Sequence, residues 1–267
     1  MLDQILLNMK VHFKFYRRNR LLLVVGLIFL AMTLLTMLPM MYTMSANTDF
    51  AILNSLYSDL NRFSFVFTAG LGLFLVSSHL KDRNIKMVLT KPCLPETWLL
   101  SGILSAVVVS FVLYLSIFVF ALIFSLVMGI PFQAGFIFIS INGFMRAVVL
   151  LSYIVFLAMI MHPVVVVMVA LIFNEGTVEQ LKFMVTVITR AFGHSRPMGL
   201  FNNVIDALYI VLPITRPISE NYNKISASMI VSSHDWVSLL QMVGYTAATA
   251  ALFFFLSDYF LRRKQLI

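Results

Sequence analysis

Two charged residues inside hydrophobic stretches are the first candidates for chemistry in this chain. Arg146 lies ten residues beyond Phe136, where one apolar stretch begins, and Glu175 lies twelve residues beyond Pro163, where the next begins. At the helical rise of 1.5 Å per residue, these positions are about 15 and 18 Å along their helices. If the two helices cross a membrane in opposite directions, both side chains reach a similar depth. An intramembrane ion pair between Arg146 and Glu175 is therefore one arrangement that the sequence allows.

Other arrangements of these two residues stay open on the sequence alone. Arg146 could extend its charged end toward the membrane surface or donate to backbone carbonyls. The second helix could also end near Asn174, which would leave Glu175 in water.

Motifs for enzymatic chemistry are absent from the sequence. There is no G-x-x-x-x-G-K-[ST] phosphate loop, no H-E-x-x-H pair and no G-x-S-x-G elbow. The five histidines are scattered singly, and the one cysteine, Cys93, cannot form an intrachain disulfide. We expect no catalytic residue, no metal and no cofactor bound to this chain.

Composition indicates the class of protein. Hydrophobic residues make up 61% of the 267 residues and charged residues only 11%, against about 25% charged residues in a soluble domain. The net charge of +8 comes from basic residues beside the hydrophobic stretches rather than on a soluble basic face. The sequence therefore predicts a membrane protein with no nucleic-acid partner.

Apolar stretches of about 20 residues predict an all-α integral membrane protein with six transmembrane helices. Residues 1–20 place apolar and basic side chains at helical spacing, which predicts an amphipathic interfacial helix on the cytoplasmic side. Residues 187–234 mix prolines and charges with a short apolar run, which predicts short external helices between spans five and six. We expect the remaining residues, 21–267, to form a single six-span transmembrane domain, with His162 and Pro163 separating spans four and five. The expected spans are 21–44, 60–79, 98–130, 136–161, 163–186 and 235–260.

Lysine and arginine in the short flanks predict the orientation. Five of them lie in residues 1–20, four in residues 79–98 and three in the C-terminal tail, whereas the connections 44–61 and 131–135 hold none. The positive-inside rule places both termini in the cytoplasm. The five bases in residues 182–224 oppose this orientation, but they belong to a longer connection that also holds Asp206 and Glu220.

The cytoplasmic connection 81–97 has a layout of its own. Residues 82–90 could form a short helix, which Pro92 would end before Pro95 helps to restart the chain toward the membrane. The plain alternative is a solvated loop whose positive charges only set the topology and contact lipids.

These features together resemble the permease subunit of the type-2 exporter family of ATP-binding cassette (ABC) transporters. The similar residues are "DRNIKMVLTKPCLPETWLLSG" from Asp82, "ALYIVLP" from Ala207 and the final "FLRRKQL". The resemblance covers nearly the whole chain. It departs at residues 93–97 and at Ser101-Gly102-Ile103, where the family often has Pro-x-Ser-Arg and Gly-Lys.

The resemblance implies a function as well as a fold. A coupling helix in the connection 81–97 would dock on a separate nucleotide-binding ATPase subunit, which would hold ATP and magnesium. The partners would be that ATPase, a second permease subunit, identical or related, and membrane lipids, and the location a bacterial cytoplasmic membrane. The implied coupling residues are Asp82, Arg83, Asn84, Ile85, Lys86, Met87, Val88, Leu89 and Thr90.

Two other classes of function stay open. The chain could be a membrane-embedded enzyme acting on lipid or peptide, for which Arg146, Glu175, Glu179 and His162 are the few polar candidates. It could also be a membrane anchor that recruits a cytoplasmic protein and transports nothing.

Overall fold

The structure, a computed structural model, describes residues 2–20, 46–79, 95–127, 133–172 and 230–265, with Gly129 and scattered residues within 24–34, 180–187, 203–204 and 224–225. Every regular element among these residues is an α-helix, as the sequence predicts. The helices are α1 (Leu2–Arg18), α3 (Ala46–His79), α5 (Pro95–Val127), α6 (Ala134–Ile160), α7 (Pro163–Ile172) and α11 (Ser233–Gln265).

Four of these helices are long and apolar enough to cross a membrane. The candidate spans are Leu53–Ser77, Glu96–Val127, Ala134–Ile160 and Ser233–Arg263, within α3, α5, α6 and α11. They correspond to the expected spans two, three, four and six. The chain therefore has the character of a multi-pass integral membrane protein.

The expected total of six spans is not confirmed. Most of the first span, 21–44, lies outside the described residues. In the fifth, 163–186, the structure describes helix α7 over the first residues, Pro163–Ile172. Most of the rest of that range, and most of the expected external helices in 187–234, also lie outside the described residues.

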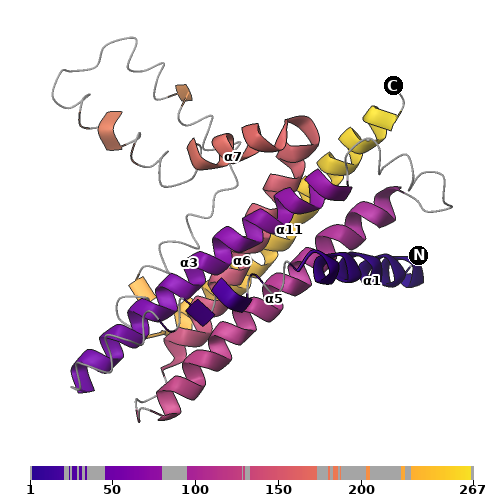
Figure 1. Cartoon of the computed structure of the whole chain (residues 1–267). Helices are drawn as coiled ribbons and strands as arrows, with labels where there is room; N and C mark the ends of the chain where they lie inside the picture. Colours follow the sequence, from indigo (N-terminus) through magenta and orange to yellow (C-terminus); the bar gives the residue numbers. More distant parts are fainter. Residues whose placement is uncertain are drawn as a thin grey trace.

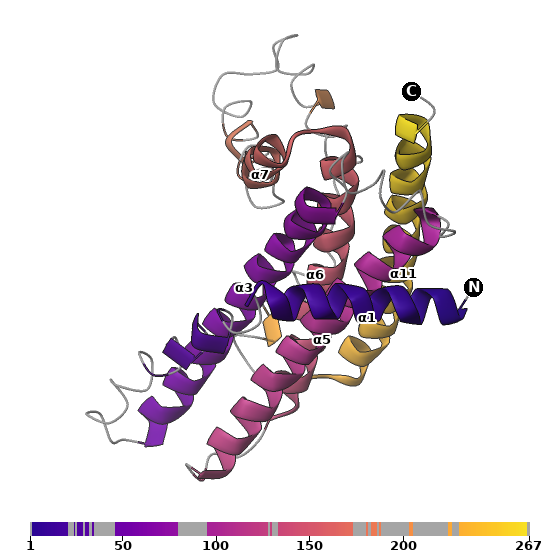
Figure 2. The ribbon, with the colours of Figure 1, turned by 45° about the vertical axis from the view of Figure 1, so that its right-hand side comes forward.

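The four long helices lie side by side, with α6 between the others (Figure 1, Figure 2). It packs against α3, α5 and α11, and 18 of its 27 residues are buried. Such a helix must be apolar nearly all round. The α6 sequence meets this demand with its long run of Val, Leu, Ile and Phe.

Polar side chains set the register between α3 and α5. Thr68 Oγ1 on α3 donates to Ser110 Oγ on α5 at 2.9 Å, and Tyr114 Oη on α5 donates to the backbone carbonyl of Asn61 on α3 at 3.4 Å. As the α3 number rises the α5 number falls, so the two helices are antiparallel. In an apolar layer, sliding one helix along the other would leave these groups unsatisfied.

α6 ends where proline forbids its continuation. The Met161 N–H still donates to the Leu157 carbonyl at 2.8 Å, but Met161 itself is extended. Pro163 has no N–H and disfavours a helical conformation at His162. The predicted break at His162 and Pro163 is confirmed, and α7 continues at an angle to the long helices (Figure 1, Figure 2).

α11 begins with a reciprocal cap. The backbone N–H of Ser232 donates to Asp235 Oδ2 at 2.8 Å, and the backbone N–H of Asp235 faces Ser232 Oγ at 3.4 Å. This is the capping-box arrangement that satisfies free N–H groups at a helix start. α11 therefore starts close to the predicted residue 235, and it extends beyond the predicted residue 260 to Gln265.

The helix that holds the expected second span, 60–79, is longer than that range. α3 begins at Ala46 and is continuous to His79. Polar residues in its first half favoured a loop; of these, Ser55 and Arg62 are exposed, whereas Asn61 is buried. One side of this half repeats apolar residues at helical spacing and is buried against α5 and α6; these residues are Leu53, Leu56, Tyr57 and Leu60.

We predict that Gly143→Ala destabilises the bundle by about 1–3 kcal/mol because the methyl group overfills a close helix contact. A Cβ at Gly143 would lie 2.9 Å from Tyr114 Cε1 and 3.1 Å from Asn61 Oδ1. Thermal unfolding of the detergent-solubilised protein, followed by circular dichroism, measures the effect.

The matched control for this substitution is Gly244→Ala in α11, where a Cβ meets nothing within 4 Å. Because alanine favours helix over glycine by about 1 kcal/mol, this variant should unfold at the same temperature or slightly higher. Equal midpoints for the two variants would contradict the close contact at Gly143.

Candidate functional site

The candidate site is the end of the bundle at which α3 and α11 finish and α5 begins. Leu75 near the end of α3 lies against Gly102 in the first turns of α5, and Arg262 near the end of α11 bonds to Glu96. The expected coupling connection joins α3 to α5 here. Its residues 82–90 lie outside the described residues, which resume at the first turn of α5.

Helix α1 is fastened to this end by one of its faces. Asn8, His12 and Tyr16, spaced by four residues, are buried. The His12 ring lies 4.5 Å from the Trp98 ring between centroids, and the Tyr16 and Ser105 hydroxyls are 3.3 Å apart. Both views show α1 running across the long helices rather than along them (Figure 1, Figure 2).

Tyr16 is the centre of this contact. Its side chain is fully buried, and its ring lies 6.2 Å from the Phe74 ring on α3. Burial raises the pKa of the Tyr16 hydroxyl above its ordinary value, while the hydrogen bond with Ser105 acts in the opposite direction. The phenol is therefore neutral at physiological pH and joins α1 to both α3 and α5.

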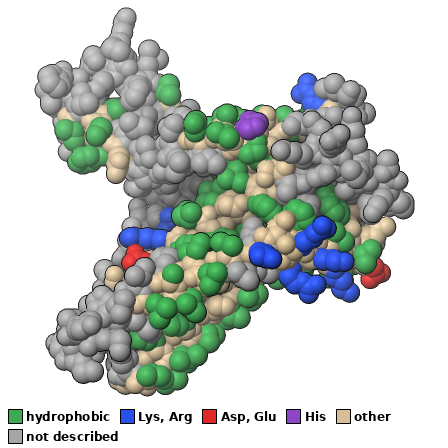
Figure 3. Space-filling model, viewed as in Figure 1, with side chains coloured by type: hydrophobic (Ala, Val, Ile, Leu, Met, Phe, Trp, Pro, Cys, Tyr) green, Lys and Arg blue, Asp and Glu red, His purple; other side chains and the backbone are tan. Residues whose placement is uncertain are grey.

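The opposite face of α1 is basic and exposed. Lys10, Lys14, Arg17 and Arg18 all lie on the surface, and Figure 3 shows basic side chains gathered over α1 beside long helices covered with hydrophobic side chains. Exposed apolar side chains, including Leu6, flank this basic face. The position of α1 at a membrane surface stays a prediction. The docked helix keeps its basic face exposed, and this is the face that would contact such a surface.

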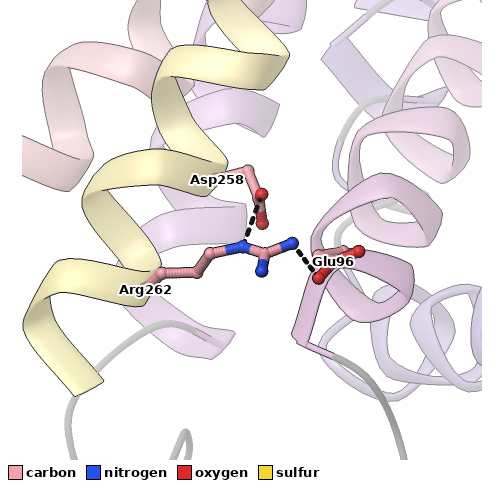
Figure 4. Close-up of polar contacts among 3 residues, drawn as sticks. All are labelled: Glu96, Asp258 and Arg262. Carbon is pink, nitrogen blue, oxygen red and sulfur yellow. Dashed lines mark hydrogen bonds and ion pairs between the residues drawn. The ribbon is translucent and has the colours of Figure 1, made fainter. Parts of the chain in front are cut away.

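An ion bridge joins α5 to α11 at the same end. Arg262 lies between two carboxylates (Figure 4): its Nη2 bonds to Glu96 in the first turn of α5, and its Nε donates to Asp258 Oδ2 at 2.9 Å. The Arg262 side chain is 55% exposed, and exposed ion pairs contribute only about 0–1 kcal/mol. The bridge therefore adds little to global stability, but it joins the first turn of α5 to the end of α11.

This bridge was not predicted from the sequence. Asp258 and Arg262 are four residues apart on one helix, which is a recognisable spacing for an ion pair. Glu96 is 166 residues away from Arg262 in the chain, and no local pattern indicates that the two meet.

Arg146 lies in the contact between α6 and α3. Its guanidinium carbon is 5.5 Å from the centroid of the Phe65 ring, a distance at which a cation is attracted to an aromatic face. Glu175 lies outside the described residues, so its pairing with Arg146 stays a prediction.

A second ion pair within a candidate span was also missed. Arg62 Nη1 and Asp59 Oδ1 are 3.7 Å apart on α3, with side chains 78% and 43% exposed. Their spacing of three residues is a signal that the sequence contains. It was overlooked because the second span was expected to start at residue 60. Among the described residues, no three His, Cys, Asp or Glu side chains gather as a metal site would require.

Comparisons of the chain with protein-family models, with curated proteins and with solved structures gave no match. The resemblance to ABC exporter permeases therefore rests on the residues quoted from the sequence.

We predict that Tyr16→Ala releases α1 from the bundle, because the change removes a fully buried aromatic ring, at a cost of about 3–5 kcal/mol. Tyr16→Phe keeps the ring and loses only the hydroxyl contact, for about 0.5–1.5 kcal/mol. Amide hydrogen exchange of residues 2–18 should accelerate strongly in the first variant and weakly in the second.

Leu7→Ala provides the control for α1, because Leu7 is on the same helix and 63% exposed. Its exchange pattern should match that of the unmodified protein. Unchanged exchange in Tyr16→Ala would show that α1 is held in some other way.

We predict that Arg262→Gln changes global stability by no more than about 1 kcal/mol but loosens the first turn of α5. Hydrogen exchange of residues 99–102, whose N–H groups donate to the first-turn carbonyls, should accelerate, and high salt should produce a similar change in the unmodified protein because it screens exposed charges. Arg263→Gln, at the exposed neighbouring position, is the control. The same acceleration in both variants would rule out a specific role for the bridge.

Proposed function

We propose that this chain is the transmembrane permease subunit of an ABC-type exporter, coupling ATP hydrolysis by a separate subunit to movement of a substrate across the membrane. One observation carries the proposal. The connection that resembles a coupling segment, 81–97, joins α3 and α5 at the end of the bundle where α1 and α11 also contact the first turns of α5.

This arrangement supports a mechanical role for the connection. A partner that moved residues 82–90 would pull on Glu96 and Trp98, the residues of α5 that hold the end of α11 and the middle of α1. The long helix α5 would carry the movement into the membrane, because a packed helix moves as a rigid element. Asp82 to Thr90 would be the short helix that the ATPase grips.

The chemistry of ATP would lie entirely on the partner. With no phosphate loop in the sequence, this chain would not be an enzyme, and ATP and magnesium would bind to the ATPase subunit. A second permease subunit, identical or related, would complete the transporter. Exposed apolar side chains on α5 and α11, such as Leu115 and Phe255, would face lipid or that second subunit.

The distribution of charge supports a cytoplasmic position for this end. Basic residues of α1 and the C-terminal Arg262 and Arg263 lie at the end of the bundle that the connection 81–97 joins. Under the positive-inside rule, both termini and the ATPase would be on the cytoplasmic side of a bacterial inner membrane.

We predict that the affinity-tagged chain, purified from its native membrane, carries a phosphate-loop ATPase whose hydrolysis depends on residues 82–90. Replacing these nine residues by a Gly-Ser linker of equal length should abolish both co-purification and ATPase activity. The measurement combines mass spectrometry of the purified complex with release of phosphate from ATP.

A linker replacement of residues 131–133, in the uncharged connection at the opposite end of the bundle, is the control and should retain the ATPase. Both variants must insert in the membrane at normal levels. Association and hydrolysis that survive the change at 82–90 would exclude this coupling segment. Co-purification of a cytoplasmic protein that is not an ATPase would favour a membrane anchor. Turnover of lipid or peptide by the chain alone would favour an enzyme.

A further inference from the structure

One face of α3 differs from the other exposed faces of the bundle. Ser55, Asp59, Arg62, Val66 and Gly70 follow one another at spacings of three or four residues, so they share one side of the helix. Ser55, Arg62, Val66 and Gly70 are exposed, and the Asp59 side chain is 43% exposed. We call these five residues the α3 polar face.

Packing places Asp59 and Arg62 within the membrane-spanning part of the bundle. In the candidate span of α3 itself, Leu53–Ser77, they lie about 9 and 14 Å from Leu53. Asn61, beside the ion pair, is level with Tyr114 of α5. Tyr114 lies 18 residues after Glu96 and 13 before Val127, the ends of an α5 span that is otherwise uncharged. At 1.5 Å per residue, Asn61 is therefore about 27 Å from one end of that span and about 20 Å from the other.

The exposed face of α5 at the same depth is mainly apolar, and its one exposed hydroxyl, that of Ser116, donates to the Val112 carbonyl of the same helix. Val108, Phe111, Val112 and Leu115 are all exposed and apolar, as expected for side chains that contact lipid. Charged side chains at this depth are unfavourable against hydrocarbon and normally face a protein interior or water. Asp59 and Arg62 form a loose pair at 3.7 Å, and further hydrogen-bond partners are needed to compensate such charges once lipid surrounds them.

We propose that the α3 polar face lines a water-filled pathway through the membrane. Water in the pathway provides hydrogen-bond partners for the donors and acceptors of Asp59 and Arg62 that their ion pair does not use. The pathway deepens the proposed function, on which it rests, because it identifies the surface along which cargo passes. Charges of both signs on this surface suit a cargo with a polar or ionic part, which they would help to solvate during passage.

Two residues of the α3 polar face allow a direct test. Val66 is 67% exposed, and a Cβ at Gly70 meets nothing within 4 Å, so a cysteine fits at either position. The contacts of Thr68 with Ser110 and of Asn61 with Tyr114 make α5 positions near 112 and 108 level with Val66 and Gly70. Val112 and Val108, both exposed, are therefore controls matched for depth.

The experiment uses the full chain with Cys93, its one cysteine, replaced by serine. Val66→Cys, Gly70→Cys, Val112→Cys and Val108→Cys are introduced one at a time. Each variant in native membrane vesicles is treated with a permanently charged, membrane-impermeant methanethiosulfonate. The reagent needs a thiolate, which forms in water but is suppressed in apolar surroundings.

We expect Val66→Cys and Gly70→Cys to react at least about tenfold faster than Val112→Cys and Val108→Cys, since a pKa difference of one unit changes the thiolate fraction tenfold. Equally slow reaction at all four positions would overturn the proposal and indicate that lipid or another part of the protein covers the face. Disulfide-linked dimers of Val66→Cys without labelling would also overturn it, in favour of a contact between two copies.

Labelling needs neither ATP nor the ATPase, so its outcome is independent of the co-purification experiment. A labelled face without an ATPase partner would leave the water-filled pathway in place and remove the exporter. An ATPase partner with an unlabelled face would leave the exporter in place and move its pathway elsewhere.

Discussion

The burial of α6 between α3, α5 and α11 is the constraint on which the rest of the structure depends. A helix surrounded on three sides has little room for error, and at Gly143 the α6 backbone approaches Tyr114 and Asn61 so closely that a methyl group would not fit. The same packing places the Arg146 side chain of α6 beside the Phe65 ring of α3.

Polar contacts between the helices complete what apolar packing begins. The hydrocarbon tails of lipids are as apolar as a leucine side chain. Burial alone therefore does not hold one transmembrane helix at a particular level against another. The contacts of Thr68 with Ser110 and of Tyr114 with Asn61 supply that level for α3 and α5. At the end of the bundle with the basic residues, Glu96 and Trp98 extend the contacts to α11 and α1. A movement of the connection before α5 would therefore reach three other helices.

Much of the fold could be predicted because hydrophobicity and proline act locally. The all-helical class, spans three, four and six to within a few residues, and the break at His162 and Pro163 all follow from short stretches of sequence. The start of α3 could not be predicted from hydropathy, because half of each turn between Ala46 and Arg62 is polar. Its helical repeat at Leu53, Leu56 and Leu60 was the signal to use. The coupling role of residues 82–90 and the pairing of Glu175 with Arg146 stay predictions.

By itself, the sequence determined that this chain belongs in a membrane, which stretches can span it and where the basic residues gather, since these properties depend on side-chain chemistry summed over neighbours in the chain. Only the tertiary structure decided that Glu96 meets Arg262, that α1 docks through Asn8, His12 and Tyr16, and that Asp59 and Arg62 lie within the membrane-spanning part of the bundle on an exposed face. The physical reason is that helix register and the rotation of each helix about its axis arise from contacts between residues far apart in the chain.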